Sequence, residues 1–187
     1  MNTIAKKLNY YTIEDIYDLP DGQRAELIDG ELFMMATPNR IHQEFVHFLD
    51  RIIGNYIYDK KGNCKVYPSP FAVFLNANND IYVEPDISVI CDKNKLTNEG
   101  CKGAPDWVIE IVSPSSRSID YNKKLLKYAT AGVREYWIVD PDKRRVMVYN
   151  FEYDIVEEYS LTDKVKAGIY EDFTIDFSEL NIVLPDA

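Results

Sequence analysis

The chain of 187 residues has few cysteines, only two histidines and no long apolar run. A membrane-spanning helix needs ~20 consecutive apolar residues, so we expect no membrane segment. The first seven residues lack the apolar centre of a secretory signal. Cys64, Cys91 and Cys101 form no C-x-x-C pair, so we expect reduced cysteines rather than a disulfide framework or a zinc site. Together these features indicate a cytoplasmic protein.

Positive charge is also scarce, because 31 Asp and Glu residues face 21 Lys and Arg residues and leave a formal net charge of −10. Such a chain is poorly suited to broad, non-specific binding of nucleic acid. It can still carry a local basic strip, and a metal site built from carboxylates would itself add negative charge. The hydrophobic content of 46% and aromatic content of 13% suffice for a folded core.

Apolar periodicity and turn residues predict alternating helices and strands. We expect helices at 12–19, 38–58 and 119–131, with Thr12 and Ser118 as N-caps, Pro38 in a first turn and Gly132 at a C-terminus. Asp29-Gly30 predicts a tight hairpin turn between two short strands. Further strands are expected at 64–67, 71–75, 81–83, 87–91, 107–112, 134–139, 145–149 and 154–161, and a polar loop at 92–105.

These elements predict a single α/β, or α+β, domain with a mixed central β-sheet flanked by helices. The domain spans residues 1–187, with a core at about 11–150 and C-terminal strands and a tail at 151–187. The apolar runs 87–91 and 107–112 are expected to be its central strands.

Two carboxylates stand beside these central strands. Asp86 precedes the first, and Glu110 interrupts the second, whose two faces are otherwise apolar. A charged group is rarely buried without a partner or a metal. Asp86 and Glu110 could hold Mg²⁺, which binds one or two carboxylates and completes its shell with water and phosphate. A salt bridge from Glu110 to Lys124 or Arg134 is the structural alternative.

The helix expected at 119–131 carries Lys123, Lys124 and Lys127. Runs of charge on a helix usually face water. However, Lys124 lies four residues before Tyr128 and shares its face, so Lys124 is expected to lean toward the sheet. A lysine near a metal site could position water or balance charge during phosphodiester hydrolysis.

Three further features carry weaker signals. His42 and His47 lie five residues apart, which is not the spacing of a helical metal pair. His42 is the nearer to its helix start and could point into a site. The stretch 113–117 could bind a phosphate through its hydroxyls and Arg117, or it could be an ordinary loop.

The sequence resembles the Uma2 family, a cyanobacteria-rich family of restriction-endonuclease-like proteins in the PD-(D/E)XK nuclease superfamily. The resemblance covers about 11–149, and its motifs are specific in combination. The motifs are the stretches 26–32 (ELIDGEL), 84–89 (EPDISV), 108–115 (VIEIVSPS) and 120–140.

This resemblance implies roles for individual residues. Asp86 and Glu110 would be metal ligands, and Glu26 would be the upstream acid that completes the site. The superfamily lysine usually lies two residues after the second acid, where this chain has Val112, so its role would pass to Lys124. His42 would support the site near the substrate, and Lys123, next to Lys124 in the sequence, would contact the substrate as well.

We therefore expect an endonuclease that uses Mg²⁺ or Mn²⁺ to hydrolyse DNA and acts as a homodimer, since cutting both strands suits a two-fold pair of sites. One alternative is a non-catalytic nucleic-acid- or protein-binding accessory protein on the same fold. A carboxylate-pair glycoside hydrolase is the third candidate, although a lysine among the acids does not favour it.

Overall fold

The computed structural model describes residues 10–78, 80–180, 182 and 184. The described helices are α1 (Ile13–Tyr17), α2 (Arg40–Asp59) and α3 (Leu125–Ala131), with a π-helical segment (Ile119–Lys124) directly before α3 and 3₁₀ turns at Lys93–Lys95 and Phe177–Glu179. The strands are β1 (Ala25–Ile28), β2 (Glu31–Met34), β3 (Lys65–Pro68), β4 (Val73–Phe74), β5 (Ile81–Val83), β6 (Ile87–Ile90), β7 (Leu96–Thr97), β8 (Gly100–Lys102), β9 (Trp107–Ile111), β10 (Glu135–Asp140), β11 (Arg145–Asn150), β12 (Ile155–Ser160), β13 (Lys164–Lys166) and β14 (Thr174–Asp176).

The predicted mixed α+β class is confirmed, but the strands form two sheets of six rather than one central sheet. One sheet has the order β12-β11-β10-β9-β6-β3, the other has the order β2-β1-β5-β4-β8-β7, and β13 pairs with β14 separately. The chain passes from the second sheet to the first between β5 and β6, at Pro85. Proline cannot donate to a strand ladder, so it separates the two strands at this point.

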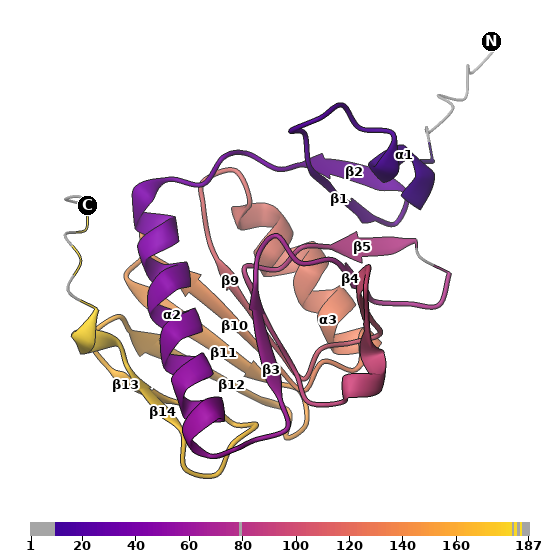
Figure 1. Cartoon of the computed structure of the whole chain (residues 1–187). Helices are drawn as coiled ribbons and strands as arrows, with labels where there is room; N and C mark the ends of the chain where they lie inside the picture. Colours follow the sequence, from indigo (N-terminus) through magenta and orange to yellow (C-terminus); the bar gives the residue numbers. More distant parts are fainter. Residues whose placement is uncertain (1–9, 79, 181, 183, 185–187) are drawn as a thin grey trace.

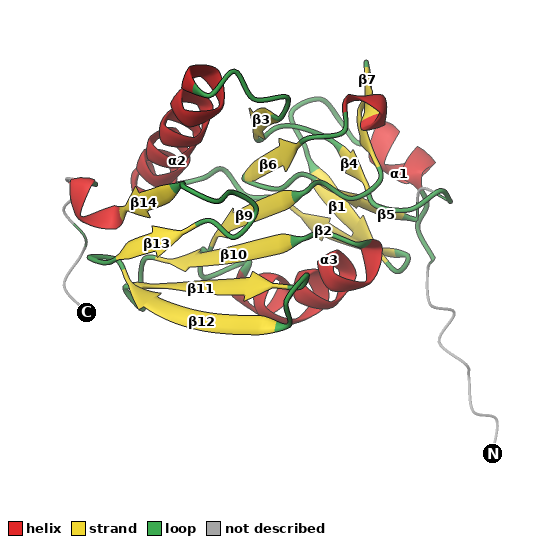
Figure 2. Cartoon of the chain, turned by 90° about the horizontal axis from the view of Figure 1, so that it is seen from below, coloured by secondary structure: helices red, strands yellow, loops and turns green. Residues whose placement is uncertain are grey.

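Helices cover both faces of the first sheet, with α2 on one face and α3 on the other (Figures 1 and 2). Successive side chains of a strand point to opposite faces, and β9 follows this rule. Trp107 and Ile109 pack with α2, whereas Val108 packs with Tyr128 of α3. Glu110 therefore lies on the α3 face, although β9 is buried along its whole length.

The predicted turn at Asp29-Gly30 is confirmed by φ angles of 54° and 76°. Thr12 is the N-cap of α1 and Gly132 ends α3 with φ 92°, also as predicted. The position of Pro38 and the cap at Ser118 were predicted wrongly. Asn39 caps α2 by accepting from the His42 amide at 2.9 Å, so Pro38 precedes the helix.

Ser118 is not an N-cap, because its backbone is already helical, at φ −66° and ψ −32°. The helical segment begins earlier because the amides of Arg117 and Asp120 donate to the carbonyls of Ser113 and Ser116 at 3.1 and 3.0 Å. The predicted polar loop 92–105 also contains a 3₁₀ turn and the short pair β7 and β8.

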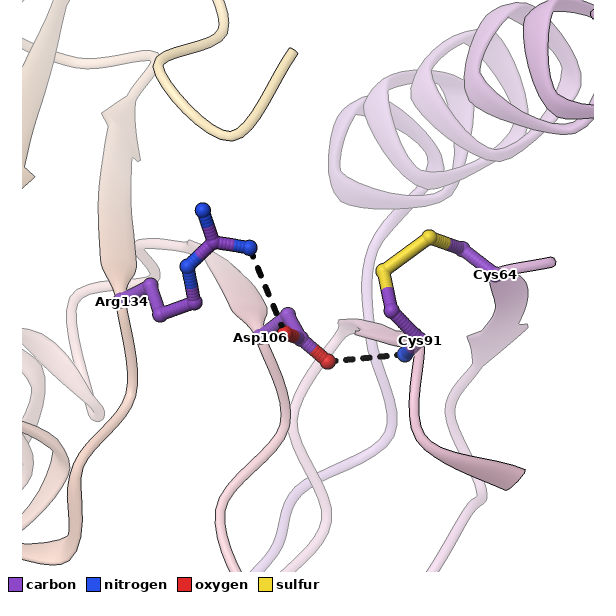
Figure 3. Close-up of a disulfide and its surroundings, with 4 residues drawn as sticks. All are labelled: Cys64, Cys91, Asp106 and Arg134. Carbon is purple, nitrogen blue, oxygen red and sulfur yellow. Dashed lines mark hydrogen bonds and ion pairs between the residues drawn. A yellow bond between two sulfur atoms is a disulfide. The ribbon is translucent and has the colours of Figure 1, made fainter. Parts of the chain in front are cut away.

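The prediction of reduced cysteines is wrong for two of the three. Cys64 and Cys91 form a disulfide (Figure 3). They follow the antiparallel register of β3 and β6, in which Lys65 pairs with Ile90, so the next residues outward lie opposite each other. A sequence separation of 27 residues gives no sign of this register. A cytoplasmic location stays a prediction.

Asp106 supports the same end of β6, because its carboxylate accepts from the Cys91 amide at 2.8 Å and lies 3.5 Å from Arg134 (Figure 3). Cys101 is a free, buried cysteine. Burial raises the pKa of the Cys101 thiol to about 11, so it stays protonated near neutral pH.

Strand β11 contributes side chains to both cores. Val146 and Val148 are buried in the core beneath α2, and Met147 and Tyr149 pack against the core beneath α3. No helix in the described part of the chain combines the length and apolar character needed to cross a bilayer.

Candidate active site

A cavity of about 540 Å³ opens where the two sheets meet. Its walls come from the segment that joins β2 to α2, the first turn of α2, the residues before β6, the end of β9 and the π-helical segment. It contains Glu26, Asp86, Glu110 and Lys124, so four residues distant in sequence lie in one place.

Lys124 is the centre of a buried charge cluster. Its Nζ lies 2.8 Å from Glu26 Oε2, 2.9 Å from Glu110 Oε1 and 3.5 Å from Asp120 Oδ1. Burial alone would lower the pKa of Lys124, but the carboxylates of Glu110, Glu26 and Asp120 raise it well above its usual value. The ammonium is therefore charged, and its direction is fixed by three acids.

The π-helical segment that precedes α3 supplies both Asp120 and Lys124. Both side chains are buried. Single π turns inside helices often occur at functional sites because they redirect side chains. Here the turn places an acid and a base from one segment inside the cavity.

Glu110 accepts hydrogen bonds on both of its carboxylate oxygens. Its Oε1 accepts from Lys124 and from the Tyr128 hydroxyl at 2.7 Å, and its Oε2 accepts from the Asp86 amide at 3.3 Å. Burial raises the pKa of Glu110 well above its usual value, Lys124 opposes this shift, and Asp120 adds to it. This carboxylate is held in a low-dielectric place where a nearby cation stabilises its charged form.

Asp86 is the most accessible acid of the cluster, since 14% of its side chain is exposed. Its Oδ2 accepts from the Ile111 amide at 2.8 Å and lies 3.1 Å from His42 Nε2. These contacts tie the start of β6 to the end of β9 and to the first turn of α2. They also fix the carboxylate's orientation at the cavity wall.

Glu26 comes from the other sheet. Its Oε1 accepts from the Glu84 amide at 3.0 Å, while its Oε2 faces Lys124. The acids of the site thus come from β1 in one sheet and from the start of β6 and the end of β9 in the other. Asp86 and Glu110 lie beside and within the two neighbouring inner strands β6 and β9, where the sequence predicted them.

The structure also contains residues that the sequence did not single out for the site. Asp120 is buried, and burial, opposed by Lys124, raises its pKa to about 6. Asp120 lies four residues before Lys124 in the sequence. That spacing indicates a contact inside the protein only if the helical segment turns this face toward the interior, and the sequence did not show that it does. Arg24 and Glu84 also line the cavity, and their contact joins residues 60 positions apart.

Two predicted substrate-binding residues lie outside the cavity lining. Arg117 binds Asp140 at 2.6 Å and Asp142 at 2.8 Å. Lys123 binds Glu31 and sits 4.6 Å from the centre of the Phe33 ring. Both basic groups are engaged in structural contacts. His42 does line the cavity, and its Nδ1 is buried without a hydrogen-bond partner among the described residues.

The cavity has far more acids than bases. Its lining includes two fixed cations, Arg24 and Lys124, against six acids: Glu26, Glu84, Asp86, Glu110, Asp120 and Asp142. No group of three or more His, Cys, Asp or Glu side chains in the described residues is arranged to hold a metal ion. A pair of carboxylates with an acid excess still fits Mg²⁺, which keeps several waters and takes one or two protein carboxylates.

Comparisons with known proteins agree with this fold. The chain is similar to a solved structure from Anabaena variabilis, described as a "putative nuclease belonging to DUF820", with a TM-score of 0.73, 22% identity and coverage of 90% of this chain and 96% of that one. This similarity shows a shared mixed α+β fold.

The sequence pattern of Uma2, described as "Putative restriction endonuclease", matches residues 13–178. The chain therefore belongs to the Uma2 family, as the sequence motifs predicted. It is also 23% identical over 148 residues to the uncharacterized protein slr1290 of Synechocystis sp., covering 77% of this chain and 76% of the relative.

Proposed function

We propose that this protein is a metal-dependent endonuclease that hydrolyses phosphodiester bonds in DNA. The observation that carries the proposal is the buried cluster of Lys124 with Glu26 and Glu110 next to Asp86, in a cavity rich in acids. The descriptions of the Uma2 family and of its solved relative support the same class of reaction.

In this proposal Asp86 and Glu110 hold Mg²⁺ or Mn²⁺. A divalent cation supplies polarisation of a phosphoryl oxygen and a more acidic bound water. A negative cavity would repel a polyanionic substrate, and a cation held there offsets that repulsion. Asp86 is suited to this role because it is the more exposed acid and its carboxylate is fixed by the Ile111 amide.

Lys124 orients the attacking water or stabilises the charge that develops on the phosphoryl group. Its ammonium is aimed by Glu26 and Glu110, and preorganised charges of this kind lower a barrier without reorganisation during the reaction. Glu26 acts by holding Lys124 in place. In this proposal a water oxygen attacks the phosphorus while the bond from phosphorus to one sugar oxygen breaks and that oxygen leaves, so no covalent enzyme intermediate is needed.

The test compares Asp86→Asn with Asp142→Asn, a second carboxylate of the cavity lining that is held by Arg117. We expect Asp86→Asn to lose DNA cleavage and to lose the heat of Mg²⁺ or Mn²⁺ binding in titration calorimetry with a DNA duplex present. Asp142→Asn should keep both. Cleavage by Asp86→Asn at the wild-type rate would exclude the assignment.

A non-catalytic accessory protein is the second candidate. The observation that favours it is the engagement of Lys124 by three acids, which leaves its ammonium enclosed. Binding of DNA or of a protein with no metal-dependent turnover would support it. We also propose that the nuclease works as a homodimer, and light scattering at working concentrations tests this directly.

A further inference from the structure

A nuclease has to bind the phosphates that flank the bond it cuts. Lys124 is 5% exposed and enclosed by acids, so it is poorly placed to reach along a strand. Arg117 and Lys123 lie outside the cavity lining. The remaining Lys or Arg of that lining is Arg24, and 38% of its side chain is exposed.

The Arg24 guanidinium is held in one orientation. Its Nε donates to Glu84 Oε2 at 2.8 Å, and its Nη2 donates to the same oxygen and to Ser69 Oγ at 2.8 Å. Nη1 makes no hydrogen bond to any described residue. Arginine is the residue suited to phosphate because its planar fork presents donors in fixed directions.

Glu84 is a firm anchor for this guanidinium. Its side chain is 8% exposed, and its Oε1 accepts from the Tyr82 hydroxyl at 2.6 Å. The Glu84 amide donates to Glu26, which in turn holds Lys124. Arg24 is therefore connected to the charge cluster through two hydrogen-bonded steps.

The position of Glu84 in the chain bounds the distance between Arg24's anchor and the proposed metal ligand Asp86. Glu84 lies two residues before Asp86 at the passage between the two sheets, and two residues separate their Cα atoms by at most roughly 7 Å. Neighbouring phosphates of a nucleic acid strand are separated by a comparable distance. A phosphate at Asp86 thus places the next one within reach of the Arg24 guanidinium.

We propose that Arg24 binds the substrate phosphate adjacent to the one that is cleaved, through its Nη1 donors. The inference rests on the proposed nuclease function and assigns a binding residue to it. Arg24 and Glu84 together carry no net charge, so the contact acts by short, directed hydrogen bonds rather than by long-range attraction. This fits a chain whose formal net charge is −10.

The experiment measures binding of a fluorescein-labelled DNA oligonucleotide, single-stranded and duplex, by anisotropy with Ca²⁺ in place of Mg²⁺. The variant is Arg24→Gln with Glu84→Gln, which removes the guanidinium without leaving a buried carboxylate unpaired and keeps the net charge. We expect its Kd to rise about tenfold, the effect of losing one charge-assisted hydrogen-bonded contact. Arg24→Lys keeps the ion pair but loses the fork, and we expect an intermediate rise.

A matched control exists outside the cavity. Arg134 donates from Nε and Nη2 to one oxygen of Glu152, at 3.0 and 2.9 Å, and 39% of its side chain is exposed. Arg134→Gln with Glu152→Gln should leave Kd within about twofold of the wild type. Thermal unfolding of each variant checks that the fold is kept.

The outcomes separate the inference from the function on which it rests. Selective weakening in the Arg24 variants supports it. An unchanged Kd in the Arg24 and Glu84 variant, or equal weakening in the Arg134 control, overturns it while the nuclease assignment stands. Failure of the wild type to bind either form of DNA overturns both.

Discussion

Glu110 and Glu135 are buried carboxylates on adjacent strands, and their surroundings differ completely. β9 and β10 run parallel, with Glu135 paired with Trp107 at one end and Ile138 paired with Glu110 further along. Both acids are almost inaccessible to water. Burial is the first cause of a raised pKa in each, with a value of about 6 for Glu135.

The hydrogen-bond partners separate the two acids. Glu135 accepts from the Trp137 indole and from the Ile169 amide, the latter at 2.9 Å. A Cβ added at Gly168 would lie 2.6 Å from Glu135 Oε2, so the chain packs tightly against this carboxylate. Glu135 therefore fastens the segment between β13 and β14 onto β10, and its hydrogen-bond donors are an indole and a backbone amide rather than ionisable groups.

Glu110 shares its site with other titratable groups that face a cavity. Lys124 and Tyr128 contact one oxygen, and Asp86 is within one hydrogen bond of the other. Burial and a raised pKa are thus common to a structural and a candidate catalytic acid. Direct contact with several other ionisable side chains is what distinguishes the second kind.

The largest expected effect is a difference in DNA cleavage between variants of the two acids. Glu110→Gln should lower DNA cleavage by about a thousandfold or more, because it removes a proposed metal ligand and a partner of Lys124. Glu135→Gln should keep the rate within about threefold, since the hydrogen bonds of Glu135 are to Trp137 and Ile169, which lie outside the charge cluster. Equal losses in single-turnover cleavage by the two variants would show that both acids contribute to catalysis to the same extent.

A second comparison uses two lysines of the same helical region. Lys124→Met leaves several carboxylates buried without their cation, and loss of one partner of a buried ion pair costs about 3–5 kcal/mol. Lys127 pairs with the exposed Asp29, so Lys127→Met should cost about 1 kcal/mol or less. Urea unfolding at pH 7 measures both. The same small loss in each variant would show that the Lys124 cluster is not a net stabilising network.

The sequence predicted the acids of the site better than its cations. Asp86 and Glu110 could be found because each interrupts or precedes an apolar strand, and a carboxylate there needs a partner. Helical spacing indicated that Lys124 leans toward the sheet, resemblance to Uma2 added Glu26 and a catalytic role for Lys124, and the structure places all four residues in one cavity. Their chemical roles stay predictions.

Contacts set by strand register or by distant segments could not be read from the sequence. The Cys64–Cys91 bond depends on how β3 pairs with β6. Arg117 was offered as a phosphate-binding residue, but Asp140, 23 positions away, engages it. Helical periodicity predicted an α-helix at 119–131, whereas the π turn, which no local pattern announces, sets where Asp120 and Lys124 point.

The smallest expected effect is a pH dependence that belongs to Glu135. Its pKa rises from 4.5 to about 6 on folding, so the folded state binds more protons than the unfolded state between these values. Stability from this group is full below pH 4.5 and is lost as the pH rises through 6, by about 2 kcal/mol in all. Glu135→Gln removes the effect, so the stability of the wild type relative to the variant should fall across this window. Urea unfolding of both proteins from pH 4.5 to 7 measures the difference, in which the titration of Asp120 cancels. A constant difference would mean that the hydrogen bonds from the Trp137 indole and the Ile169 amide fully offset the burial of Glu135, so that its pKa does not change on folding.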